Sequence, residues 1–182
     1  MIQRDIIERA KEKDEEAMEE IYLEFKDFVW NIALKTAGSR TAAEDAAAET
    51  FIRVFKKIGK FNFKSSFKTW LYRVTVNTTL NCMDKERRRK TLHLNEEYRD
   101  IQAEGSAPQD DGRDNEMVNK MLDKLEPKER IFVYLRDIQG TAYNEIADIM
   151  KMNIGTVKTN IYRAREKLRK IYKEEFPNEE RM

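Results

Sequence analysis

The chain has 182 residues, with 35 lysines and arginines, 34 aspartates and glutamates, and a formal net charge of +1. One cysteine and one histidine exclude an intrachain disulfide and a cysteine–histidine zinc site. No apolar run approaches the roughly 18 residues of a membrane span, and the N-terminal segment lacks a signal-peptide core. We therefore expect a cytoplasmic protein without membrane insertion. Only six glycines and three prolines interrupt the sequence, which favours an all-α fold.

Charge is segregated along the chain. Two basic blocks, residues 41–90 and 128–182, flank an acidic block at 91–127. Because nucleic-acid binding depends on a local basic surface, the near-neutral total does not exclude DNA. The pattern predicts two contact regions joined by a connector that phosphates repel.

The first ninety residues have the spacing of amphipathic helices. Helices are expected over 2–13, over 15–37 with Gly38 as the stop, and over 41–58. Thr41, with Glu44 three residues on, forms a capping-box pattern for the third helix. The positions expected inside are Ile21, Phe25, Phe28, Val29, Ile32, Ala33, Phe51, Val54, Phe55 and Ile58.

Aromatic and cationic residues are interleaved in a short loop at 60–66 and in the long helix expected from Phe67. Phe61, Phe63, Phe67, Trp70 and Tyr72 lie among Lys60, Lys64, Lys68 and Arg73. This composition suits a single-strand surface, where bases stack on rings at about 1–3 kcal/mol each and cations follow the backbone. The other interpretation is that the rings form the core. The basic run at 85–90 also has two interpretations: it binds phosphates, or it is the solvated end of a helix.

Periodicity fails between 91 and 115, where acidic residues accompany Gly105, Pro108 and Gly112. This predicts a flexible linker and a domain boundary. A second helical domain follows, in which Pro127 opens a helix that ends at Gly140. Its expected core consists of Met117, Met121, Leu122, Leu125, Ile131, Phe132, Leu135 and Ile138.

The segment 141–170 has the pattern of a helix-turn-helix. Ile146, Ala147 and Met150 share one helical face, and Asn153 is a suitable N-cap for the next helix. The apolar stripe of that second helix is Ile154, Val157, Ile161, Ala164 and Leu168. Its polar face suits a DNA major groove, although a helical hairpin with a charged outer face would have the same pattern.

Four segments carry a resemblance to a known family: AAEDAAAETFIRVFKKIGKF, SSFKTWLYRVTVNTTLN, LDKLEPKERIFVYLRDIQGTAYNEIA and GTVKTNIYRAREKLR. In this order they resemble the extracytoplasmic-function (ECF) sigma factors of bacterial transcription initiation. The resemblance implies a non-enzymatic protein without cofactors, whose partners are core RNA polymerase, promoter DNA and an anti-sigma factor. It also implies sigma region 2 at 1–90, a linker at 91–115 and sigma region 4, with the helix-turn-helix, at 116–176.

The same resemblance assigns site residues. Contacts with core polymerase are expected at Asp45, Glu49, Phe51, Arg53 and Val54. Recognition of the −10 element and capture of its non-template strand are expected at Lys60, Phe61, Asn62, Phe63, Lys64, Ser65, Ser66, Trp70, Arg73, Asn77 and Asn81. Recognition of the −35 element is expected at Arg136, Tyr143, Asn144, Lys158, Thr159, Tyr162 and Arg163.

Three positions depart from the family pattern. Lys151 stands in the helix-turn-helix turn, where glycine is common, so a lysine must adopt positive φ or the turn must loosen. Asn160 replaces a frequent arginine. The tryptophan pair with which housekeeping sigma factors open DNA is here Trp70 and Leu71. With one strand-separating side chain fewer, we expect this protein to need a closer match to its promoter sequence.

Two other functions fit parts of the sequence. A conventional helix-turn-helix regulator would bind duplex DNA without polymerase, but residues 1–90 show no βα alternation of a receiver domain. A nucleic-acid enzyme would need a catalytic motif, and no glycine-rich phosphate loop or carboxylate cluster is present in the sequence.

Overall fold

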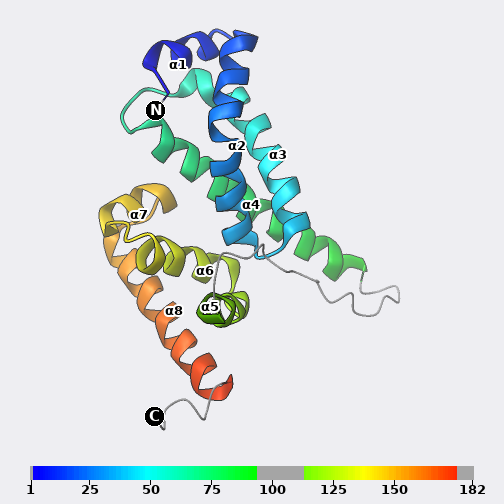
Figure 1. Cartoon of the computed structure of the whole chain (residues 1–182), viewed down its shortest axis with the longest axis vertical. Helices are drawn as coiled ribbons and strands as arrows, with labels where there is room; N and C mark the ends of the chain where they lie inside the picture. Colours follow the sequence, from blue (N-terminus) through cyan, green and yellow to red (C-terminus); the bar gives the residue numbers. More distant parts are fainter. Residues whose placement is uncertain (1, 94–112, 176–182) are drawn as a thin grey trace. The chain divides into compact units, whose positions relative to one another are not determined.

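The computed structural model describes residues 2–93 and 113–175, and the regular structure within them is helical, which confirms the all-α prediction. The chain divides into two compact units between Ser106 and Ala107. The first contains α1 (Arg4–Lys11), α2 (Glu15–Ala37), α3 (Arg40–Lys57), a 3₁₀ turn (Ile58–Lys60) and α4 (Phe67–His93) (Figure 1). The second contains α5 (Arg113–Asp123), α6 (Pro127–Val133), a π-helical turn (Tyr134–Ile138), α7 (Tyr143–Met150) and α8 (Ile154–Glu175).

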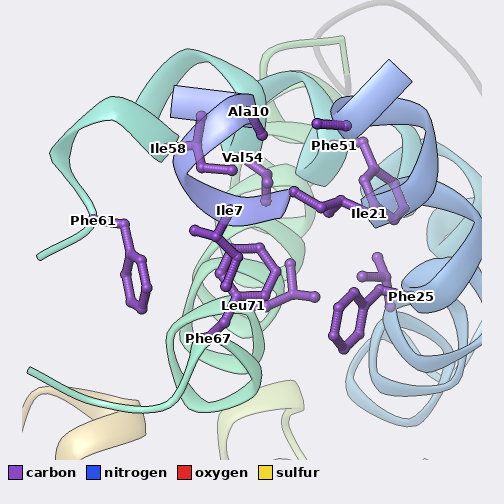
Figure 2. Close-up of a cluster of buried hydrophobic side chains, with 12 residues drawn as sticks. Ile7, Ala10, Ile21, Phe25, Phe51, Val54, Ile58, Phe61, Phe67 and Leu71 are labelled. Atoms are coloured by element: carbon purple, nitrogen blue, oxygen red, sulfur yellow. The ribbon is translucent and has the colours of Figure 1, made fainter. Parts of the chain in front are cut away.

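In the first unit, α2, α3 and α4 pack on one another, and α1 packs against α2. Every helix contributes to one apolar core, shown in Figure 2. Ile21, Val54 and Leu71 are fully buried at its centre. The predicted core positions of α2 and α3 are confirmed, except that Phe28 and Phe55 are only partly buried.

Two helices of the first unit differ in their bounds from the sequence prediction. α1 is shorter than expected because Lys13 adopts a left-handed conformation (φ 66°) and the Asp14 carboxylate accepts the Ala17 N–H (3.1 Å), which starts α2. The capping box at Thr41 was wrong: α3 begins at Arg40, with Ser39 in the cap position and no side-chain cap bond. Glu44 instead pairs with Arg40, at 3.3 Å.

Buried threonines line the packed faces of α2, α3 and α4. Their hydroxyls donate to the carbonyl four residues earlier at 2.7–2.9 Å, as seen for Thr36, Thr50, Thr75 and Thr79. Because an unpaired buried hydroxyl is costly, these bonds are what make threonine acceptable in an apolar interior. Each of these four hydroxyls is thus satisfied within its own helix.

In the second unit, α6 and α7 pack against α8, with Phe132, Leu135, Ile146 and Ile161 deep in the interior. Ile138 is 52% exposed, so its prediction as a core residue was wrong. The reason is the π-helical turn, whose wider winding departs from the α-helical spacing on which the prediction rested. Ile154 at the start of α8 is also exposed, whereas Val157, Ile161 and Ala164 of the predicted stripe are buried.

A buried arginine holds the corner between α5 and α6. The Arg130 guanidinium donates to the carbonyls of Leu122 (2.9 Å) and Asp123 (3.1 Å), and its side chain is only 9% exposed. Burial lowers the pKa of Arg130, and the nearby Asp123 carboxylate opposes that effect. A charged side chain therefore fixes this corner, whereas the other buried residues in the described part of the second unit are apolar.

Helix also covers both ends of the expected linker, since α4 continues to His93 and α5 begins at Arg113. The remaining linker positions, including the glycines and the proline that marked it, lie outside the described residues. No helix in the described ranges is long and apolar enough to cross a membrane.

Candidate nucleic-acid and polymerase interfaces

The outer face of α3 carries the residues expected to contact polymerase. Asp45 is exposed, and Arg53 donates to the Glu49 carboxylate at 2.7 Å, which lowers the pKa of Glu49. Phe51 and Val54, from the same predicted set, lie in the core and are not available to a partner. We therefore correct that set: the two residues hold α3 in place, while the acidic and basic side chains form the surface.

Sequence reasoning missed an apolar residue on this face. Ile52 is 48% exposed and follows Asp45 and Glu49 at helical spacing, so the three share one side of α3. Tyr22 of α2 is also exposed, and its ring packs edge-on against Phe51, 4.8 Å away. Helical spacing alone places Ile52 on the charged face, since it follows Asp45 and Glu49 by seven and three residues.

The loop between α3 and α4 is built on an aromatic cluster. Phe61 and Phe67 are buried with their rings 5.5 Å apart, and Trp70 lies 5.4 Å from Phe61. Tyr72 is buried as well. Most of these rings therefore belong to the core, and Phe61 is corrected from a base-stacking candidate to a support of the loop.

The polar side chains of the loop lie outside this cluster. Lys60, Asn62 and Lys64 are exposed, and the Lys64 N–H donates to the Asn62 side chain at 3.3 Å. Ser65 is half-buried. The Ser66 hydroxyl accepts the Thr69 N–H at 3.0 Å, so it caps α4, which competes with a role in DNA binding.

Phe63 occupies a special position in the loop. It is half-buried and adopts a left-handed conformation (φ 58°), which is unusual for a bulky residue. Two cations from α1 lie over its ring, Arg4 at 4.4 Å and Lys11 at 5.3 Å from the centroid. Sequence analysis assigned α1 no such role, because nothing in its pattern links it to a loop fifty residues away.

The predicted residues of α4 lie on one side of the helix, next to the loop. Trp70, Arg73, Asn77 and Asn81 recur at three- and four-residue intervals and so share a face, opposite the buried Leu71, Thr75 and Thr79. The Asn77 amide donates to the Arg73 carbonyl at 2.9 Å, while Asn81 is exposed. The structure thus aligns the four predicted residues of this helix on one strip, in which Asn81 is exposed and the other three are half-buried.

The helix-turn-helix of the second unit has the expected turn. Lys151 adopts the left-handed conformation (φ 51°) at the end of α7, which confirms the first of the two possibilities for this lysine. The Asn153 side chain accepts the Thr156 N–H at 2.7 Å and caps α8, as predicted. Lys151 therefore adopts the backbone conformation that glycine usually supplies here, at a steric cost that glycine does not have.

Three of the predicted −35 residues form a stack beside α8. The Arg136 guanidinium lies 4.5 Å and the Lys158 ammonium 5.7 Å from the centre of the Tyr143 ring. Arg136 also donates to the Thr141 carbonyl at 3.0 Å. Asn144, Thr159, Tyr162 and Arg163 are exposed, Tyr162 by 64%. Residues from α7, α8 and the π-helical turn are thereby brought together on one side of the unit.

Both units match protein families of known function. Residues 21–89 match the family model for sigma-70 region 2, and residues 115–168 match the model for sigma-70 region 4. The chain is 33% identical over 176 residues to the ECF RNA polymerase sigma factor SigW of Bacillus subtilis, covering 90% of this chain and 93% of that protein. It is 31% identical to the ECF sigma-E factor of Haemophilus influenzae, covering 88% and 90%.

The chain belongs to the ECF sigma factors, which are transcription initiation factors and not enzymes. Solved structures share the fold. The sigma factor RpoE of Bartonella quintana, in complex with the anti-sigma factor NepR, aligns with a TM-score of 0.67 at 23% identity, over 85% of this chain and 96% of that one. CnrH in complex with the cytosolic domain of CnrY aligns with a TM-score of 0.61 at 21% identity, over 92% and 95%.

Proposed function

We propose that this protein binds core RNA polymerase and directs it to promoters that carry spaced −35 and −10 elements. Membership of the ECF family supports the general activity. The single observation that carries the detailed proposal is the strip on α4, where half-buried Trp70, Arg73 and Asn77 and exposed Asn81 share one face beside an exposed basic loop. A ring, amides and cations along one strip match what an unpaired strand requires.

In this proposal each unit binds a different promoter element. The first unit, corresponding to residues 1–90, captures the non-template strand of the −10 element with the strip and with Lys60, Asn62, Phe63 and Lys64. A base leaving its stack would find a ring and amides, and its phosphates would find lysines. The second unit, residues 116–176, reads the −35 duplex with α8 and the stack around Tyr143. Core polymerase is contacted by the outer face of α3.

The decisive experiment is run-off transcription with purified bacterial core polymerase on a library of genomic fragments, with and without this protein. We expect discrete new transcripts whose upstream regions share two spaced elements. Asn77→Ala with Asn81→Ala should reduce open complexes on a recovered promoter by an order of magnitude, roughly the cost of one to two lost base contacts. Tight duplex binding without any start site would favour a conventional regulator instead.

An anti-sigma factor is the further partner we propose. The RpoE structure that shares this fold is a complex with such an inhibitor, and the fold similarity covers most of both chains. A cytoplasmic location follows from the same function, because core polymerase and the chromosome are there. Affinity capture of the tagged protein from its host, followed by loss of run-off activity on adding the captured partner, tests this. A captured protein that leaves transcription unchanged would contradict it.

A further inference from the structure

The π-helical turn places two consecutive charged residues against the recognition surface. Arg136 packs on Tyr143, and the next residue, Asp137, receives the Arg165 guanidinium of α8. Arg165 Nε donates to one carboxylate oxygen at 3.2 Å and a terminal nitrogen donates to the other. This is the two-pronged geometry in which an arginine is held most firmly.

Arg165 belongs to the same surface as the −35 candidates, although the sequence did not assign it there. It lies seven residues after Lys158, so the two side chains point within about 20° of each other, about 10 Å apart along the helix. The hydrogen bond with Asp137 raises the pKa of the Arg165 guanidinium, so this arginine stays charged. Both members of the pair remain partly exposed.

Among the side chains joined by these contacts, Asp137 is the one acid in a group of cations. A carboxylate at this position has two opposite effects on DNA binding. It repels phosphates, which weakens binding to any duplex. It also fixes the orientation of an arginine that would otherwise sample many rotamers, which favours a contact in one register.

We propose that the Asp137–Arg165 pair is a specificity element of the DNA-binding face: Arg165 contacts a phosphate of the −35 duplex, and Asp137 positions it while restraining non-specific affinity. The inference rests on the proposed function, since it needs the −35 duplex to lie on this face of α8. It adds one binding residue, Arg165, and one positioning residue, Asp137, to those assigned above.

The test uses holoenzyme reconstituted from the full chain and core polymerase. The probes are a duplex covering the −35 element of a recovered promoter, and the same duplex with that element scrambled. Asp137→Asn should raise affinity for the scrambled duplex about two- to fivefold and lower the ratio between the two probes. Arg165→Gln should weaken binding to both about five- to tenfold and reduce the slope of log affinity against log salt by about 0.9.

A matched control exists on the other side of α8. Lys167 pairs with Glu129 of α6 at 2.8 Å, and it points about 160° away from Arg165. Glu129→Gln also removes one acid, and it should leave both probes unaffected. A merely structural Asp137–Arg165 bridge would lower thermal stability in both variants without moving DNA affinity in opposite directions.

The inference is overturned if Asp137→Asn and Arg165→Gln change DNA affinity in the same direction, or if neither changes it more than Glu129→Gln does. Run-off transcription by the unmodified holoenzyme is measured in parallel. If the unmodified holoenzyme produces transcripts but neither variant changes duplex affinity, the role of the Asp137–Arg165 pair is rejected and the proposed function is retained. If no transcripts appear, the proposed function itself has failed.

Discussion

The two units each place cations over a half-buried aromatic ring, Phe63 in the first and Tyr143 in the second, but they support that ring differently. In the first, aromatics that alternate with cations turn inward, so Phe61 and Phe67 become core and the lysines of the loop are left outside. In the second, Tyr143 is half-buried, and Arg136 and Lys158 lie over its ring. Composition alone therefore does not say whether an aromatic supports a binding surface from beneath or forms part of it.

The largest effect should come from removing a supporting ring. Phe67→Ala should lower the free energy of unfolding of the first unit by about 3–5 kcal/mol, because a large buried ring leaves a cavity. Denaturant unfolding followed by circular dichroism measures it. Asn62→Ala, in the exposed loop, is the control and should change stability little. A loss below about 1 kcal/mol in Phe67→Ala would show that this ring is not a support.

The buried arginine of the second unit gives the next largest effect. Arg130→Ala should lower the unfolding free energy of that unit by about 2–4 kcal/mol, because the carbonyls of Leu122 and Asp123 lose their donor. Thermal unfolding of the full chain is the readout. Arg130→Lys keeps the charge without the forked geometry and should fall between alanine and the unmodified protein. Equal stability of all three would refute the role of the corner.

Removing the half-buried ring of Tyr143 should act on binding more than on folding. Tyr143→Ala should weaken holoenzyme binding to a −35 duplex about three- to tenfold, because Arg136 and Lys158 lose the ring that orients them. Tyr143→Phe keeps the ring and should retain most of the affinity. Stability should change by no more than about 1 kcal/mol, which contrasts with the ring at 67. A large loss of stability in Tyr143→Ala would erase the difference between the units.

The smallest effect comes from a feature that the units share. Lys13 and Lys151 both adopt positive φ in the turn after a short helix. Replacing either with glycine should raise the unfolding free energy of its own unit by about 0.5–1 kcal/mol, since glycine adopts this conformation without steric cost. Alanine at either position keeps the strain and should give no gain. Thermal melting distinguishes the variants, and a gain with alanine would point to an effect other than backbone strain.

Regular apolar spacing made most of the fold predictable. The bounds of α2 and the Asn153 cap follow from local chemistry, and the structure has them as expected. For Lys151 the sequence left two possibilities, and the structure has the positive φ. Ile138 could not be placed, because a π-helical turn breaks the period that the prediction assumes. Which aromatic rings are buried could not be predicted either, because it depends on tertiary packing. Phe61 is buried, whereas Phe63, two residues further on, is half-buried.

The sites themselves were partly visible in the sequence. The strip on α4 could be read from spacing, and it lies on one face as that spacing requires. The link between Asp137 and Arg165 could not, because it joins residues twenty-eight positions apart through the π-helical turn. Contacts from α1 to Phe63 are of the same kind. Pairing across helices is set by packing, which no single segment encodes.

The buried threonines of α2, α3 and α4 bear on how freely this interior can change. The hydroxyls of Thr36, Thr50, Thr75 and Thr79 are each satisfied by a carbonyl of their own helix, so these four demand no polar partner on a neighbouring helix. A helix can therefore gain or lose one without a compensating change elsewhere. Such positions should drift among threonine, serine, alanine and valine one at a time, which leaves the outer faces of α3 and α4 free to diversify on a stable frame.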